Sequence, residues 1–156
     1  MFKFYSFFLL LLMTTLHVFS QNKNVEWIEF EQLEDSLNTK QKKIFIFFYT
    51  DWCSYCKKME NAAFKNQKVI SLLKRDYYPV KFNSEYKGEI IFEGRKYVNK
   101  KIGKKRNSNH QIPLMLASRK DYAFSLPAII ILNESFEVTK RYFEYLSPKK
   151  MIKILE

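Results

Sequence analysis

The sequence is poor in the residues that interrupt regular structure and in those that bind metals. Its 156 residues include only three glycines and four prolines to separate its segments. It holds two cysteines and two histidines, and one of these histidines falls in the N-terminal segment discussed below. Zinc sites take four ligands of suitable type. A metal carrier built on Cys53, Cys56 and His110 is therefore disfavoured, His110 is expected to start or pack a helix, and we predict neither a metal nor a cofactor.

Acidic residues are also scarce. The chain has 16 Asp and Glu residues and 27 Lys and Arg residues, which gives a net charge of +11. A surface of this sign attracts anionic partners.

Hydrophobic residues make up 47% of the chain and aromatic residues 17%, which argues against disorder. One domain with a sizeable core is expected at this length.

The N-terminal segment lacks a hydrophobic run long enough to span a membrane, which takes about 20 residues. It has Lys3 at the front, an apolar centre over residues 7–13, and Val18-Phe19-Ser20 at its end. This pattern predicts a secretory signal peptide over residues 1–20, with cleavage after Ser20. No cysteine lies near that position, which excludes a bacterial lipoprotein anchor. We therefore expect a periplasmic or secreted domain over residues 21–156, in an oxidising compartment.

The two cysteines lie where a strand is predicted to give way to a helix. The apolar run 44–48 is typical of a buried strand, and the apolar residues from Met59 to Phe64 recur at helical spacing. Cys53 would lie at the helix start, where unpaired N–H groups and the helix dipole favour its thiolate. Cys56 lies one turn further on the same face, so the pair can close a short disulfide. This geometry predicts a dithiol that cycles between two states.

Two separated motifs resemble the thioredoxin superfamily, in particular its secreted or periplasmic members. The first is Trp52-Cys53-Ser54-Tyr55-Cys56-Lys57-Lys58-Met59-Glu60, and the second is Ser125-Leu126-Pro127 before an apolar strand, similar to the family's cis-proline segment. The resemblance covers roughly residues 25–155. It implies an α/β thioredoxin-like fold with a mixed central sheet flanked by helices.

The resemblance also implies roles for single residues. Cys53 would be the exposed nucleophile that attacks a substrate disulfide, and Cys56 would resolve the mixed disulfide. Glu60, one turn beyond Cys56, would assist proton transfer, with a solvent-facing carboxylate as the alternative. The substrate would be bound by Trp52, Ser54, Tyr55, Leu126 and Pro127, although ordinary packing also explains Trp52.

This sequence departs from the usual thioredoxin residues at several positions, which leaves the direction of electron transfer open. Phe47 stands six residues before Cys53, where many thioredoxins carry a buried acid, and Ser54-Tyr55 replaces the usual Gly-Pro pair. We favour a disulfide reductase over an oxidase or isomerase. The expected partners are protein disulfides and an upstream thiol electron donor, and the expected state is a monomer.

The remaining pattern predicts the other elements. Strands are expected over residues 25–28, 78–82, 128–132 and 136–142, helices over 30–37, 69–75, 110–122 and from Pro148, and a hairpin over 89–98 that turns at Glu93-Gly94. Residues 84–122, called the insert below, depart from the simple alternation of strands and helices.

The insert carries most of the concentrated charge. Arg95 to Arg106 holds seven basic residues and no acidic one. Such a run is usually a solvated loop, and the alternative is a site for anionic substrates, glycans or lipid headgroups. Nucleic acid is disfavoured because no stacking motif interleaves the charges. A competing function is a non-catalytic binding or chaperone module, with a structural disulfide and this loop as its working surface.

Overall fold

The computed structural model describes residues 24–104 and 106–156. The predicted signal peptide and its cleavage site after Ser20 lie outside the described residues. Within them, a four-stranded sheet has the order β2-β1-β5-β6. Its strands are β1 (Lys43–Tyr49), β2 (Tyr77–Asn83), β5 (Ala128–Leu132) and β6 (Val138–Tyr142).

The sheet is mixed, as predicted. Strand β1 pairs with β2 in parallel, with Ile46 opposite Val80. It pairs with β5 antiparallel, with Phe48 opposite Ala128. Strand β6 then pairs antiparallel with β5. The C-terminal end of β1 therefore lies beside the N-terminal end of β5 and the C-terminal end of β2, and loops from all three strands meet at one edge of the sheet.

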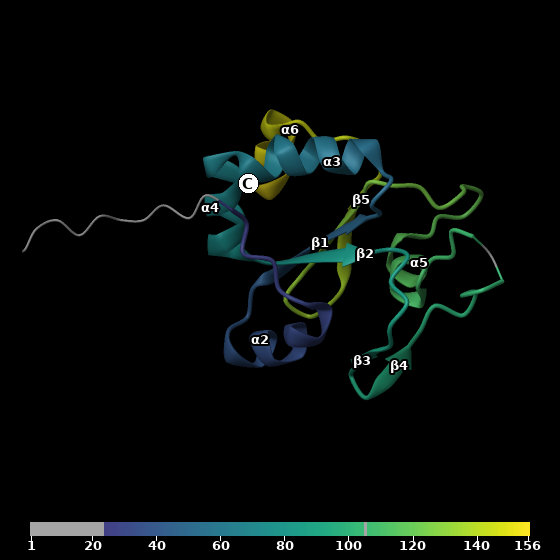
Figure 1. The fold of residues 1–156 in the computed structure, drawn as a ribbon. Helices are drawn as coiled ribbons and strands as arrows, with labels where there is room; N and C mark the ends of the chain where they lie inside the picture. The colour runs from purple at the N-terminus through teal and green to yellow at the C-terminus, as the bar shows by residue number, and fades with distance from the viewer. Residues whose placement is uncertain (1–23, 105) are drawn as a thin grey trace, which may run out of the picture.

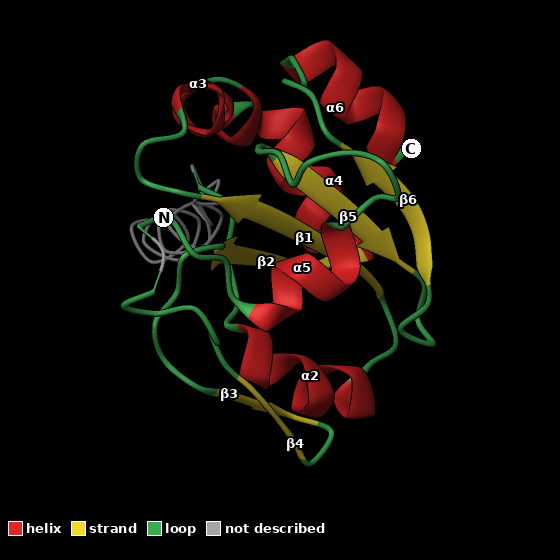
Figure 2. Cartoon of the chain, turned by 90° about the vertical axis from the view of Figure 1, so that its right-hand side faces the viewer, coloured by secondary structure: helices red, strands yellow, loops and turns green. Residues whose placement is uncertain are grey.

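Two hydrophobic cores lie on the two faces of the sheet, because successive side chains of a strand point to opposite faces. Phe45 and Phe47 of β1 belong to one core, while Ile44, Ile46 and Phe48 belong to the other. The first core is covered by α3 (Ser54–Asn61), α4 (Gln67–Asp76) and α6 (Pro148–Leu155), the second by α2 (Leu33–Thr39) and α5 (Gln111–Ala117), as Figures 1 and 2 show. The result is a three-layer α/β fold.

Local signals account for where the helices start. Asn66 caps α4, with its Oδ1 accepting hydrogen bonds from the N–H groups of Lys68 and Val69. Ser147 caps α6 ahead of Pro148, and its Oγ accepts from Lys150 N. A side-chain oxygen satisfies N–H groups that have no partner inside the helix, and proline fits the first helical position. The predicted start of the last helix is confirmed.

Several predicted boundaries are wrong. The predicted strand over residues 25–28 is reduced to one isolated bridge, between Ile28 and Val80. Helix α3 stops at Asn61, and a short 3-10 turn over Ala63–Lys65 follows it. Helix α5 ends at Ala117, and the carbonyl of Leu116 in its last turn accepts a hydrogen bond from Arg141 Nε of β6 at 2.8 Å. Arg141 thus gives the Leu116 carbonyl the hydrogen bond that a backbone N–H of the next helical turn would give it if α5 continued.

The predicted strand from residue 136 begins only at Val138. Phe136 has a positive φ of 62° and belongs to the turn after β5, where Asn133 Oδ1 accepts hydrogen bonds from Ser135 N and Glu137 N. A residue with this backbone conformation cannot continue a strand. The turn predicted at residues 133–135 is confirmed and extends slightly further.

The insert leaves the sheet at the edge where β1 ends and is held there (Figure 1). Its hairpin of β3 (Ile90–Phe92) and β4 (Arg95–Tyr97) turns at Glu93 and Gly94, as predicted, and both have positive φ angles, 49° and 66°. Two-residue hairpin turns require this conformation, which glycine adopts readily. Ser84 N donates to Tyr49 O, which ties the start of the insert to β1, and His110 N donates to Ser84 O at 2.7 Å, which ties the start of α5 to the same point. None of the helices over residues 24–104 and 106–156 is long and apolar enough to cross a membrane.

Candidate active site

The junction between β1 and α3 carries the two cysteines. Cys53 is the N-cap of α3, and its backbone N–H donates to Thr50 O at 3.1 Å. Its Sγ accepts a hydrogen bond from Cys56 N at 3.2 Å. The first N–H groups of a helix have no partner inside it and carry its partial positive charge. The Cys53 sulfur therefore occupies a position that stabilises negative charge once the disulfide opens.

Cys53 and Cys56 form a disulfide, with their Cα atoms 5.2 Å apart. Cys53 keeps 5% of its surface accessible and Cys56 keeps 1%. The more accessible cysteine is the predicted nucleophile, but it is buried and not exposed as predicted. The reason is its contact with the first core, against which Leu126 also packs.

The Leu126–Pro127 segment lies at the same edge of the sheet. The peptide bond between these residues is cis, and Pro127 is buried next to Ala128, which pairs with Phe48 of β1. Continuing that register places Pro127 beside the end of β1, from which the chain runs on to Cys53. Two segments about 70 residues apart in the sequence thus lie at the same end of the sheet, and Leu126 packs against the core that contains both cysteines.

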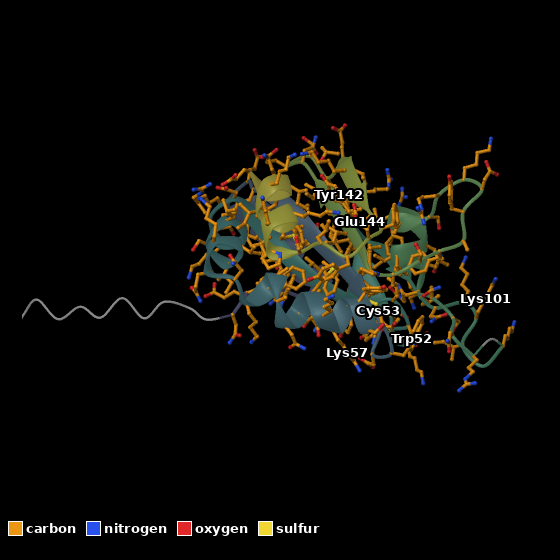
Figure 3. The ribbon with its side chains drawn as sticks, turned by 90° about the horizontal axis from the view of Figure 1, so that it is seen from above. Trp52, Cys53, Lys57, Lys101, Tyr142 and Glu144 are labelled. Carbon is orange, nitrogen blue, oxygen red and sulfur yellow. A yellow bond between two sulfur atoms is a disulfide. The ribbon has the colours of Figure 1, made fainter. Side chains whose placement is uncertain are left out.

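A groove of about 490 Å³ lies between Trp52, which directly precedes Cys53, the segment before Pro127 and the insert; neither cysteine lines it. Its lining residues are Trp52, Glu85, Asn107, Asn109, Ala123, Phe124, Ser125 and Leu126. Trp52 is 61% exposed, and its Nε1–H donates to Glu85 Oε1 at 3.0 Å. The indole is therefore a wall of the groove, not a core residue. Figure 3 shows Trp52 beside Cys53 at the end of the molecule that carries the insert.

Ser54 and Tyr55 lie elsewhere. Both are exposed in the first turn of α3, and neither lines the groove. The Tyr55 ring packs 6.4 Å from that of Tyr145, which also lies under Lys58 Nζ at 4.7 Å. Of the predicted substrate-binding residues, Trp52 and Leu126 line the groove, Pro127 follows it in the chain, and Ser54 and Tyr55 form the outer side of the helix start.

Glu60 is paired with a lysine of β2. Its Oε1 lies 2.6 Å from Lys81 Nζ, and both side chains are about 30% exposed. The ammonium group also lies 4.3 Å from the ring centre of Tyr49. Burial raises the pKa of Tyr49, with Lys81 opposing this effect, so Tyr49 is a neutral phenol at neutral pH. Glu60 and Lys81 line a separate hollow of about 350 Å³ and do not line the groove.

Phe47 occupies the position where a buried acid is common in thioredoxins. It is fully buried in the same core as both cysteines, and its ring stacks on Tyr49 with centroids 6.0 Å apart. No carboxylate of β1 therefore underlies the disulfide. Among the described residues, Glu60 is the predicted proton-transfer group, held in place by Lys81.

Three residues that position the site were not predicted from the sequence: Lys81, Glu85 and Arg119. Arg119 Nη2 donates to Ser125 Oγ at 2.9 Å, and its guanidinium lies 3.8 Å from the Phe143 ring centre and 4.9 Å from that of Tyr122. It thereby fixes the segment before Leu126. The sequence offered no signal for this contact, because Arg119 fell within a helix predicted to reach Tyr122.

His110 is a structural residue, as predicted. Its Nδ1 accepts from Ile112 N at 3.3 Å as the cap of α5, and its Nε2 lies 3.1 Å from Tyr97 O and donates to it. Burial lowers the pKa of His110, so the ring is neutral. Over residues 24–104 and 106–156, no group of three or more His, Cys, Asp or Glu side chains could hold a metal ion.

A mixed sheet, covering helices and a Cys-x-x-Cys pair beside a cis-proline define a thioredoxin-like protein. A sequence model of the thioredoxin-like domain family matches residues 30–156, and the chain belongs to this family.

Solved structures share this fold. One described as a DsbH oxidoreductase is 16% identical with a TM-score of 0.59, and the match covers 86% of this chain and 84% of that one. The solution structure of a putative disulphide-isomerase from Bacteroides thetaiotaomicron is 19% identical with a TM-score of 0.57, covering 86% and 92% of the two chains. At these identities the comparison establishes the fold.

A curated relative also matches part of the chain. An uncharacterized protein from Archaeoglobus fulgidus is 25% identical over 71 residues, which is 45% of this chain and 56% of that protein. The match therefore spans a little over half the length of that relative.

Proposed function

We propose that the protein is an exported thiol-disulfide oxidoreductase that reduces disulfides of other proteins. The observation that carries this proposal is the placement of Cys53 and Cys56 at the start of α3, beside the groove that Trp52 and Leu126 line. The family supports the chemistry, and one neighbour of the same fold is described as an oxidoreductase.

The reaction starts from the reduced pair. The Cys53 thiolate, stabilised by the Cys56 N–H and the helix start, attacks one sulfur of a substrate disulfide and releases the other as a thiolate. Cys56 then attacks the Cys53 sulfur, forms the Cys53–Cys56 disulfide and releases the second substrate thiolate. Two electrons pass to the substrate, and two protons end on its thiols. An upstream thiol donor reduces the pair again.

The other predicted residues have supporting roles in this mechanism. Glu60 accepts the Cys56 proton, directly or through water, as the resolving thiol becomes a nucleophile. Trp52, Leu126 and Pro127 bind the substrate chain around its disulfide, while Ser54 and Tyr55 form the outer rim. The protein acts as a monomer in the periplasm or outside the cell, and residues 1–20 are the signal peptide that takes it there.

The test is to trap the intermediate. In Cys56→Ser, the resolving sulfur is missing, so mixed disulfides between Cys53 and substrate proteins should accumulate and disappear on treatment with a reductant. They would be measured as higher-mass species by non-reducing electrophoresis and mass spectrometry.

Cys53→Ser is the matched control, since it leaves a single cysteine that is more deeply buried and should form few adducts. If Cys56→Ser accumulates no adducts, or if Cys53→Ser accumulates as many, the assignment of Cys53 as nucleophile is wrong.

The second candidate is a non-catalytic binding or chaperone module on the same fold. The near-complete burial of both cysteines favours it, because a disulfide that partners cannot reach is structural. The insert would then be its working surface. A redox titration of the Cys53–Cys56 pair, run together with insulin reduction, separates the two candidates.

A further inference from the structure

Another depression, called the hollow from here on and distinct from the one that Glu60 and Lys81 line, adjoins the groove on the side of the insert. It measures about 450 Å³, and its lining residues are Glu85, Lys87, Ile102, Gly103, Lys104, Arg106 and Ser108. Glu85 lines both the hollow and the groove. The two depressions are therefore neighbours, and a single extended ligand can occupy both.

Three side chains, Lys87, Lys104 and Arg106, give the hollow its positive charge. Lys87, Lys104 and Arg106 form no ion pair with any acid in the part of the chain that the structure describes. Lys96 of the same insert, by contrast, is paired with Glu89 at 2.8 Å. Glu85, the only acid that lines the hollow, uses its Oε1 to accept the Trp52 hydrogen bond. Among the described residues, three cations and one acid line the hollow, which leaves it positive, and Glu85 connects it to the groove.

The backbone around the hollow is held by buried polar contacts. Asn99 is 95% buried, and its Nδ2 donates to Ser108 O at 2.7 Å, which joins the two ends of the basic loop. Val98 N donates to Gln111 Oε1 at 2.9 Å, and Gln111 N donates to Val98 O at 3.1 Å. Lys104 and Arg106 are therefore presented on a segment anchored on both sides, which reduces the ordering cost of binding a ligand.

We propose that this hollow binds acidic side chains of the substrate protein that flank the cysteines reduced at Cys53. The inference rests on the proposed function and adds the class of substrate: an extended polypeptide with Asp or Glu beside its disulfide. A concave cationic hollow that continues into the groove suits a chain crossing both depressions. A lipid surface suits the geometry less well, because a flat bilayer surface cannot follow a concave hollow that continues into the groove.

The test separates docking from redox chemistry by using peptides without cysteine. Two fluorescently labelled peptides carry a central serine in place of the reactive cysteine, flanked by glutamates in one and by glutamines in the other. Fluorescence anisotropy should show about tenfold tighter binding of the glutamate peptide at low salt. The difference should shrink as salt is added, since screening weakens exposed charge pairs.

The informative variant is Lys87→Gln/Lys104→Gln/Arg106→Gln, which should bind both peptides equally. The matched control is Lys140→Gln/Lys149→Gln/Lys153→Gln, which makes the same change in net charge at exposed positions on β6 and α6. The control should keep the preference for glutamate. Equal binding of the two peptides by the unmodified protein, or equal losses in both variants, would overturn the proposal.

Two further measurements distinguish lipid binding from peptide docking, and peptide docking from disulfide reduction. If the insert variant loses binding to phosphatidylserine vesicles while its peptide preference is unchanged, the hollow binds lipid headgroups and the proposal is wrong. Disulfide-bridged versions of the peptides report on the redox step. Binding with a glutamate preference but no reduction would contradict the proposed function alone, and reduction without a preference would contradict the docking proposal alone.

Discussion

At the scale of single residues, Phe47 leaves β1 without a carboxylate near the cysteines, and we propose Glu60 as the proton acceptor in its place. A phenylalanine beneath the disulfide adds packing to the first core but cannot accept a proton. Glu60 lies one helical turn beyond Cys56 and is held 2.6 Å from Lys81. Its spacing follows from the sequence, but its partner does not, because Lys81 lies on a strand that only the fold brings alongside α3.

The role of Glu60 leads to the first residue-scale prediction. Glu60→Gln keeps the size of the side chain but removes its ability to take a proton, so the rate of disulfide reduction should fall by about tenfold or more. The pH dependence of the rate should also change, which loss of packing alone would not cause. Insulin reduction measured across pH gives both quantities.

The matched control for this variant is Glu144→Gln, which removes an exposed carboxylate paired with Lys150. It should leave the rate and its pH profile unchanged. A Glu60→Gln protein with the pH profile of the unmodified chain would rule out the proton-transfer role.

Arg119 gives the second residue-scale prediction. Arg119→Gln removes the hydrogen bond to Ser125 and the contacts with Phe143 and Tyr122, so the segment before Pro127 loses its anchor. Reduction of peptide disulfides should weaken by about fivefold to tenfold, mainly as a higher KM, since a hydrogen bond from a charged group contributes about 1.5–3 kcal/mol. Reduction of a small aromatic disulfide, which does not need the groove, should change little.

Lys120→Gln is the control for Arg119→Gln, because it makes the same change in charge at the adjacent exposed position. Should both variants behave alike, the effect belongs to charge and not to the anchored segment.

At the scale of elements, the sequence predicts that a helix or strand is present better than it predicts the residue at which that element ends. The apolar run of β1, the spacing of α4 and the Ser147-Pro148 start of α6 are local signals, and each is confirmed. The predicted C-terminal ends of α3 and α5 were wrong by several residues. The carbonyl of Leu116 finds its partner on β6, 25 residues away, and no local periodicity records such a contact.

His110 at the start of α5 gives an element-scale prediction about pH. Burial holds the pKa of His110 below its ordinary value of about 6.5, and hydrogen bonds to the backbone of Tyr97 and Gly88 oppose this shift only in part. The unfolded chain therefore takes up a proton that the folded chain resists. The free energy of unfolding should fall as the pH drops below about 6.5, by at most about 1.4 kcal/mol per pH unit.

Urea unfolding at about pH 7.5 and about pH 5.5 measures this slope. His110→Asn keeps a side-chain acceptor for Ile112 N but removes the titration. Its stability should be lower at both pH values, with a smaller difference between them. A slope as steep in His110→Asn as in the unmodified protein would show that other groups cause the acid sensitivity.

At the scale of the whole molecule, the fold joins segments that the sequence keeps apart. The resemblance of residues 52–60 and 125–132 to thioredoxins was enough to predict the sheet, the flanking helices and the placement of Pro127 at the end of β1 from which the chain runs to the cysteines. The groove was not predictable, because part of its lining, Glu85, Asn107 and Asn109, comes from the insert, and Trp52 meets Glu85 across 33 residues of chain. The basic run in the insert was visible as composition, but its place beside the groove depends on the backbone ties from Ser84 to Tyr49 and from His110 to Ser84.

The central claim is that the bond between Cys53 and Cys56 opens and closes in exchange with other proteins. A redox titration of the pair against a glutathione buffer, run in parallel with insulin reduction, tests it most directly. We expect a reduction potential above about −300 mV together with turnover, since disulfides that only stabilise exported proteins lie below that value. A potential below about −300 mV with no turnover would identify the disulfide as structural and contradict the account.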